Sequence, residues 1–102
     1  MGELPRLLKE MRALVTERGV YRVEEVHRRP LGDLDVIVSY SSPGADKRFA
    51  GYRSDGDGWR RLNAAWRDLP EARREIGTVI GSAPLADRNM TKLLDLAREI
   101  AG

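Results

Sequence analysis

The sequence of 102 residues contains no cysteine and only one histidine. Without cysteine the chain has no disulfide, no thiolate metal ligand and no cysteine nucleophile. A single histidine, His27, leaves too few ligands for a typical zinc site. The glycine-containing segment 77–82 lacks the Gly-Lys-Ser/Thr ending of a phosphate-binding loop. We therefore predict no bound metal and no cofactor.

Long uncharged stretches are also absent. The longest, residues 76–86, has 11 residues, whereas a membrane-spanning helix needs about 20. Residues 1–10 carry acids and bases among their leucines and lack the apolar run of a signal peptide. We therefore expect a cytoplasmic protein that has no membrane partner.

The composition that is present fits a folded domain. Hydrophobic residues make up 41% and charged residues 33% of the chain, which argues against disorder. The length is typical of one domain, so we predict that residues 1–102 form a single compact α+β domain. Basic residues number 18 and acidic residues 16, which gives a net charge of +2. Because the two signs are interleaved along the chain, this charge indicates a mixed polar surface rather than a basic tail.

Apolar residues recur at helical spacing in the N-terminal segment. The pattern predicts a helix over residues 3–18, because residues three and four apart share one face of a helix. Gly19 is then expected to end the helix in a left-handed conformation. The apolar residues of the pattern are Leu4, Leu7, Leu8, Met11, Leu14 and Val15.

A second helical pattern begins at Trp59 and predicts a helix of about 12 residues, with both tryptophans in the core. Pro70 is expected to end this helix and to begin another over residues 70–80, which Gly77 weakens. A last helix is predicted over residues 90–101. The large apolar residues of the second pattern are Trp59, Leu62, Trp66 and Leu69.

Three segments between these patterns are rich in β-forming residues. Residues 20–27 alternate poorly, which indicates a bulge or a frayed end. Residues 35–41 and 47–53 flank a short turn and predict a hairpin with Asp35 opposite Arg53 and one apolar face. The predicted fold is α+β: an N-terminal helix, a three-stranded antiparallel meander, then two or three C-terminal helices packed on the sheet.

The second face of the predicted hairpin is the main candidate for a contact site. It carries the apolar pair Ile37 and Phe49 among polar neighbours, as interaction sites often do. This pair is exposed if the helices cover only the first face, and it is buried if a C-terminal helix wraps behind the sheet. The residues that we predict to contact a partner are Ile37, Phe49, Lys47 and Arg53.

Arginines on one flank of the helix predicted from Trp59 form a second candidate site. Arginine binds phosphate groups through two parallel hydrogen bonds, so such a flank is typical of nucleic-acid contacts. Interleaved acids also allow the plainer interpretation of a solvated helix face. The nucleic-acid contacts that we predict under this alternative are Arg28, Arg29, Arg60, Arg67, Arg73 and Arg74.

These features favour a small non-catalytic binding or regulatory protein, of the inhibitor or adaptor type. Its partner is another protein or, in a homodimer, a second copy of the chain, bound at the apolar face or at an unpaired edge strand. The alternative is a nucleic-acid-binding protein that uses the arginines. We expect no enzyme, because the spacing selects no nucleophile and no orienting carboxylate for His27.

Overall fold

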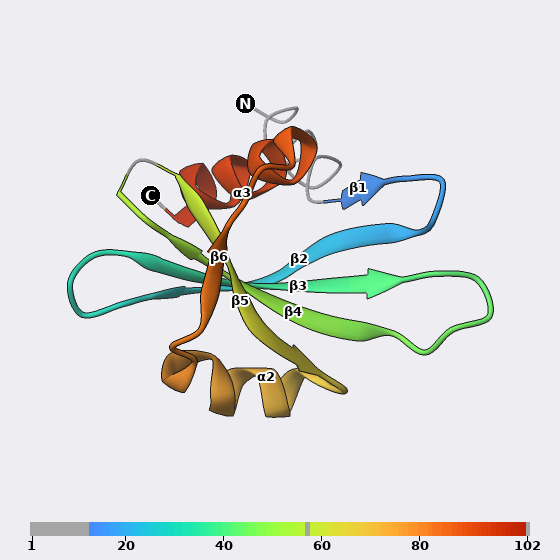
Figure 1. Ribbon diagram of the computed structural model, residues 1–102, viewed down its shortest axis with the longest axis horizontal. Helices are drawn as coiled ribbons and strands as arrows, with labels where there is room; N and C mark the ends of the chain where they lie inside the picture. Colours follow the sequence, from blue (N-terminus) through green and yellow to red (C-terminus); the bar gives the residue numbers. More distant parts are fainter. Residues whose placement is uncertain (1–12, 57, 102) are drawn as a thin grey trace.

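The computed structural model describes residues 13–56 and 58–101, which form one α+β domain. Six antiparallel strands make a single sheet in the order β1-β2-β3-β4-β5-β6, so each strand lies beside its neighbours in the sequence (Figure 1). The strands are β1 (Ala13–Val15), β2 (Val20–Arg28), β3 (Leu34–Ser41), β4 (Arg48–Ser54), β5 (Trp59–Trp66) and β6 (Ser82–Pro84). The helix α2 (Leu69–Glu75) and the 3-10 helix η1 (Ile76–Thr78) connect β5 to β6, and α3 (Arg88–Ala101) follows β6.

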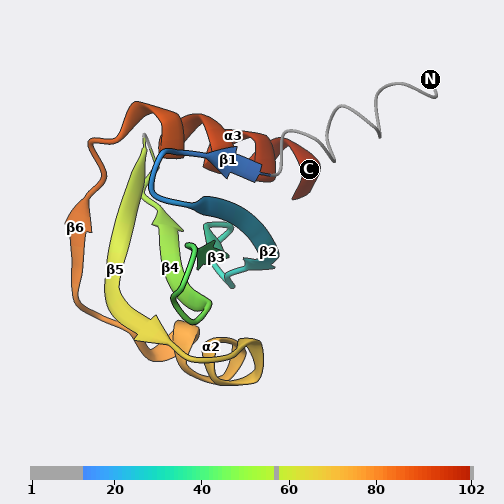
Figure 2. The same cartoon turned by 90° about the vertical axis from the view of Figure 1, so that its right-hand side faces the viewer.

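The helices α2 and α3 lie on opposite sides of the sheet (Figures 1 and 2). Side chains alternate between the two faces of a strand, so each face contributes to a separate core. The core on the α3 side contains Leu34, Val36, Val38, Tyr52, Trp59, Met90, Leu93, Leu94 and Ala97. The core on the α2 side contains Ile37, Phe49, Leu62, Trp66, Ala72 and Ile76.

The prediction of a three-stranded sheet is wrong, because the segment predicted as a helix from Trp59 is strand β5. Trp59 faces the core under α3, whereas Leu62 and Trp66 face the core under α2. Buried residues three and four apart indicate a helix only when they share one face. Here they alternate between two cores, so the same spacing belongs to a strand that is covered on both sides. Both tryptophans are buried, as predicted.

The pairing of β4 with β5 is irregular at Gly51, where a side chain would not fit. Ala50 pairs with Ala65 and Tyr52 pairs with Arg61, so residues 62–64 of β5 lie opposite Gly51 alone. A Cβ atom at Gly51 would lie 2.9 Å from the side chain of Leu62 and 2.9 Å from the ring of Trp66. The missing side chain therefore lets the large residues of β5 pack directly on the backbone of β4.

The predicted N-terminal helix is also wrong over the part that the structure describes. Residues 3–12 lie outside the described residues, and Ala13–Val15 form strand β1. Gly19 has no positive φ and is not a left-handed helix stop. A Cβ atom there would collide with the carbonyl oxygen of Ser41, so glycine lets the turn between β1 and β2 approach β3 closely.

Other expectations are confirmed. The β3–β4 hairpin has the predicted register, with Asp35 opposite Arg53. The poor alternation of residues 20–27 is a bulge, because Val23 pairs with Val38 while Glu25 pairs with Ile37. The last predicted helix is α3, which begins after Asp87; the carboxylate of this residue accepts hydrogen bonds from the backbone N–H groups of residues 89 and 90.

Candidate functional site

The three tyrosines of the chain meet at one hollow on the α3 side of the sheet. Tyr21 in β2, Tyr40 in β3 and Tyr52 in β4 line a cavity of about 380 Å³. The cavity lies toward the end of the sheet where the β1–β2 and β3–β4 turns are found, on the right of Figure 1. We call this site the tyrosine–arginine hollow, and its further charged lining residues are Arg18, Arg48 and Arg61.

Small side chains create the hollow. Ala50 and Ala65 are directly paired across β4 and β5, and both line the cavity together with Val38. Paired residues of antiparallel strands point to the same face, so two adjacent positions of this face carry only methyl groups. The buried side chains of α3 pack in the same core as Leu34 and Trp59, toward the other end of the strands, which leaves this end open.

The tyrosine side chains form a fixed wall. Tyr21 and Tyr40 are paired across β2 and β3, and their ring centroids lie 4.6 Å apart with the planes tilted by 36°. The hydroxyl of Tyr40 donates a hydrogen bond of 3.0 Å to the backbone carbonyl oxygen of Arg18. Tyr52 is only 4% exposed. Burial raises the pKa of its phenol, Arg61 lowers it to a smaller extent and Asp87 raises it slightly.

The arginine side chains stand at the rim of the hollow. Arg48 lies opposite Tyr40 and Arg61 opposite Tyr52, so both share the face of the tyrosines, and Arg18 lies in the β1–β2 turn. All three are exposed. Within residues 13–56 and 58–101, none of the three forms an ion pair with a carboxylate, although Arg29, Arg53, Arg60 and Arg73 each do. The hollow therefore combines positive charge with an aromatic wall.

The predicted partner-binding pair lies inside the protein. Ile37 is 0% exposed and Phe49 is 8% exposed, because α2 and η1 cover this face of the sheet. The second of the two alternatives, a C-terminal helix behind the sheet, is the one that the structure adopts. Lys47, also predicted to contact a partner, lies 3.4 Å from the carboxylate of Glu24.

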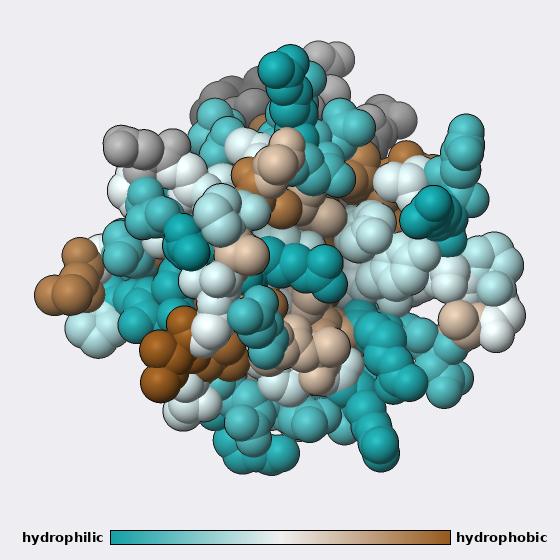
Figure 3. Space-filling model, in the orientation of Figure 1, coloured by the Kyte–Doolittle hydropathy of each residue, from teal (hydrophilic) through white to brown (hydrophobic). Residues whose placement is uncertain are grey.

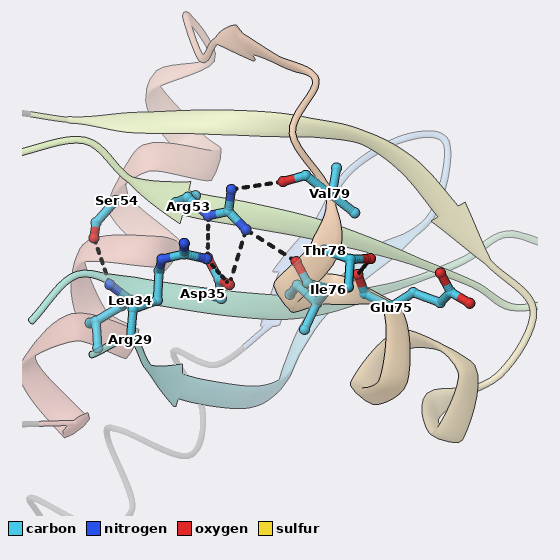
Figure 4. A network of polar contacts seen from close by, with 9 residues as sticks. All are labelled: Arg29, Leu34, Asp35, Arg53, Ser54, Glu75, Ile76, Thr78 and Val79. Atoms are coloured by element: carbon cyan, nitrogen blue, oxygen red, sulfur yellow. Dashed lines mark hydrogen bonds and ion pairs between the residues drawn. The ribbon is translucent and has the colours of Figure 1, made fainter. Parts of the chain in front are cut away.

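Arg53, the fourth predicted contact residue, belongs to a polar network that holds η1 to the sheet (Figure 4). Its Nε donates to Oδ1 of Asp35 at 2.6 Å, and its Nη2 donates to Oδ2 of Asp35 at 3.2 Å. The same guanidinium donates to the carbonyl oxygens of Val79 and Ile76, at 2.9 and 3.1 Å. Arg29 adds a third hydrogen bond to Asp35, at 3.0 Å.

The arginines predicted to bind nucleic acid do not form one surface. Arg28 donates to the carbonyl oxygen of Ala101 at the end of α3. Arg73 and Arg74 belong to α2, and Arg67 precedes it, on the other side of the sheet. Arg60 donates to the hydroxyl of Ser82 in β6. The prediction placed these arginines along one flank of a helix that begins at Trp59, and this helix does not exist because residues 59–66 form strand β5.

His27 lies beside the bulge of β2. Its Nε2 is 2.9 Å from Oε1 of Glu25, which also pairs with Arg73. The hydrogen bond from Arg73 lowers the pKa of Glu25, and burial opposes this shift. Ser39 donates its hydroxyl to Glu24 at 2.7 Å. Among the described residues, the structure contains no hydrogen bond between a serine hydroxyl and His27, and no group of three or more His, Cys, Asp or Glu side chains that could hold a metal ion.

Sequence reasoning missed the tyrosine–arginine hollow. The predicted hairpin register did put Tyr40 and Tyr52 on one face. However, the helix predicted from Trp59 removed Arg61 and Ala65 from the sheet, and Tyr21 was not aligned with Tyr40. A β interpretation of residues 59–66, with the two alanines opposite each other, is the signal that would have revealed it.

Comparisons with protein-family models, curated proteins and solved structures found no match to this chain. In the part of the chain that the structure describes, no helix has both the length and the apolar character that crossing a membrane requires. Since a fold alone does not determine a function, the chemistry of the site is the guide to what the protein binds.

Proposed function

We propose that the protein is a non-catalytic binding protein that holds a negatively charged partner in the tyrosine–arginine hollow. The observation that carries this proposal is the group of three exposed guanidinium groups around one cavity, without a carboxylate partner in residues 13–56 and 58–101. A guanidinium group binds carboxylate or phosphate oxygens through paired, charge-assisted hydrogen bonds. A cavity rimmed by several such groups is suited to an anionic ligand.

The prediction of a protein partner or a homodimer depends on an exposed apolar sheet face and an unpaired edge strand, and the structure weakens both arguments. Ile37 and Phe49 are buried, and the edge strands β1 and β6 have only three residues each, with Pro84 in β6. Short edges and proline discourage the addition of a further strand. Among residues 13–56 and 58–101, the exposed large apolar residues are Val15, Leu31 and Ile80, which come from three different segments. Figure 3 shows apolar areas separated by hydrophilic side chains on the face that it draws. In the part of the chain that the structure describes, these features favour the hollow over a sheet edge or an apolar patch as the contact site.

The test is a nuclear magnetic resonance titration of the ¹⁵N-labelled full chain at low salt with two polyanions. One is a single-stranded thymidine oligonucleotide of 20 nucleotides and the other is poly-L-glutamate. We expect at least one of them to shift the backbone signals of Tyr21, Ala50 and Ala65, which line the hollow. The proposal fails if neither polyanion binds, or if the shifts centre on α2.

A pair of charge-reversal variants supplies the control. Arg48→Glu removes a cation from the rim and introduces an anion, so we expect it to abolish the shifts. Arg74→Glu makes the same change on the exposed side of α2, across the sheet from the hollow, and we expect it to bind as the unmodified chain does. Equal losses in both variants would contradict the assignment of the site, because they would indicate a general effect of net charge.

A further inference from the structure

The hollow is suited to a flat ring system. Its floor consists of the methyl groups of Ala50 and Ala65, and the paired rings of Tyr21 and Tyr40 form its wall. The volume of about 380 Å³ is within the range of small-ligand sites, about 300–1,000 Å³. Aromatic side chains stack on nucleobases without regard to sequence, because every base has a π face. One base resting on the alanine floor would therefore meet a tyrosine ring.

The charges are distributed as a chain of phosphates requires. Arg18, Arg48 and Arg61 come from the β1–β2 turn, β4 and β5, so the cations surround the floor instead of meeting at one point. A base in the hollow would leave its own phosphate and those of its neighbours over this rim. Asp87 is the carboxylate that acts electrostatically on Tyr52, and it also accepts the hydrogen bonds that cap α3.

We infer that the tyrosine–arginine hollow binds single-stranded nucleic acid, with a base against the tyrosines and phosphates on the arginines; this inference depends on the proposed function and names its ligand. An acidic peptide satisfies the arginines but offers no ring to the aromatic wall. A duplex satisfies the arginines too, but each of its bases is stacked between neighbours and cannot reach the floor.

The first test is fluorescence polarisation with a fluorescein-labelled thymidine oligonucleotide of 20 nucleotides, at several salt concentrations. Each phosphate contact on a single strand contributes about −0.7 to the slope of log K against log salt, so three arginines predict a slope of about −2. We expect Arg48→Ala to reduce the magnitude of this slope by about 0.7. The matched control, Arg74→Ala on α2, leaves the slope unchanged.

The second test separates stacking from charge. Tyr21→Leu retains the net charge but removes a ring, so we expect the affinity to fall about fivefold or more, with the slope unchanged. Ala65→Leu fills the floor at an exposed position and should weaken binding without loss of stability, which a thermal denaturation of each variant checks. An oligonucleotide that carries 5-iodouracil should crosslink to Tyr21 or Tyr40.

Four outcomes would overturn the inference. If poly-L-glutamate binds in the hollow and the oligonucleotide does not, the inference fails and the proposed function stands, with an acidic protein as the partner. If a 20-base-pair duplex binds as tightly as the single strand, the hollow does not select unstacked bases. If Tyr21→Leu binds the oligonucleotide as well as the unmodified chain does, the affinity comes from charge and not from stacking. If neither polyanion binds, both the inference and the proposed function fail.

Discussion

Replacement of Asp35 by alanine should cost the protein a large part of its stability. The side chain of Asp35 is 3% exposed and accepts three hydrogen bonds, two from Arg53 and one from Arg29. Its removal leaves the guanidinium of Arg53, which is 18% exposed, without its counter-ion. The loss of one partner from a buried ion pair costs about 3–5 kcal/mol, mainly because the other charge remains desolvated.

The expected cost lies at the low end of that range, for two reasons. Arg53 keeps its hydrogen bonds to the carbonyl oxygens of Ile76 and Val79, so part of its charge is still compensated. Arg29 has a side chain that is 32% exposed and can turn toward water. A loss of about 3 kcal/mol is still a large fraction of the 5–15 kcal/mol that stabilises a typical domain. It corresponds to a decrease of roughly 2 M in the midpoint of urea unfolding.

The assay is equilibrium unfolding in urea, followed by tryptophan fluorescence, since Trp59 lies in one core and Trp66 in the other and the combined signal reports on the loss of both. Asp33→Ala is the matched control, because Asp33 is exposed and its substitution should change stability by less than about 0.5 kcal/mol. The reasoning is refuted if Asp35→Ala is no less stable than Asp33→Ala. If Asp35→Ala does not fold, Arg29→Ala tests the outer part of the network, with an expected cost of about 1 kcal/mol or less.

Two further predictions concern the packing around β4. Gly51→Ala forces a Cβ atom to 2.9 Å from Leu62 and should cost about 1–3 kcal/mol in thermal unfolding, whereas Gly77→Ala, which meets nothing within 4 Å, should be nearly neutral. Equal losses of stability in the two variants would contradict the close packing of Leu62 and Trp66 on the backbone at Gly51. Absorbance titration should show Tyr52 ionising above the usual pKa of 10.0, and stability should fall as the pH rises above this value, because only the unfolded chain then releases the proton. Tyr52→Phe removes both effects, and three tyrosines that titrate together would contradict the burial.

The β3–β4 hairpin was predictable because its information is local. A short turn and strict alternation determine which residues face each other, and a shift by one residue would expose the whole apolar set. The pair of Asp35 and Arg53 follows from that register alone. The burial of this pair does not follow from the register. It depends on η1 and the residue after it, because the carbonyl oxygens of Ile76 and Val79 accept hydrogen bonds from the guanidinium of Arg53.

Strand β5 was not predictable from spacing, because its residues serve two cores. Trp59 and Leu62 are three apart, as on a helix face, yet they point to opposite sides of the sheet. A periodicity argument assumes one buried face, and the presence of helices on both faces is a tertiary property. The same property explains why Ile37 could be interpreted from the sequence either as a contact residue or as core.

The tyrosine–arginine hollow depends on a single bulged residue. Because Val23 pairs with Val38 and Glu25 with Ile37, Glu24 is an extra residue in β2. If the same residues paired regularly in the register of the second half of β2, without the bulge, Tyr21 would lie opposite Ser41 and point toward the α2 side instead of standing beside Tyr40. The bulge also places both glutamates on the α2 side, away from the arginines of the hollow, where Glu24 meets Lys47 and Glu25 meets Arg73. The bulged pairing thus brings an aromatic ring to the site and keeps negative charge away from it. No local pattern in residues 20–27 distinguishes such a bulge from a frayed strand end.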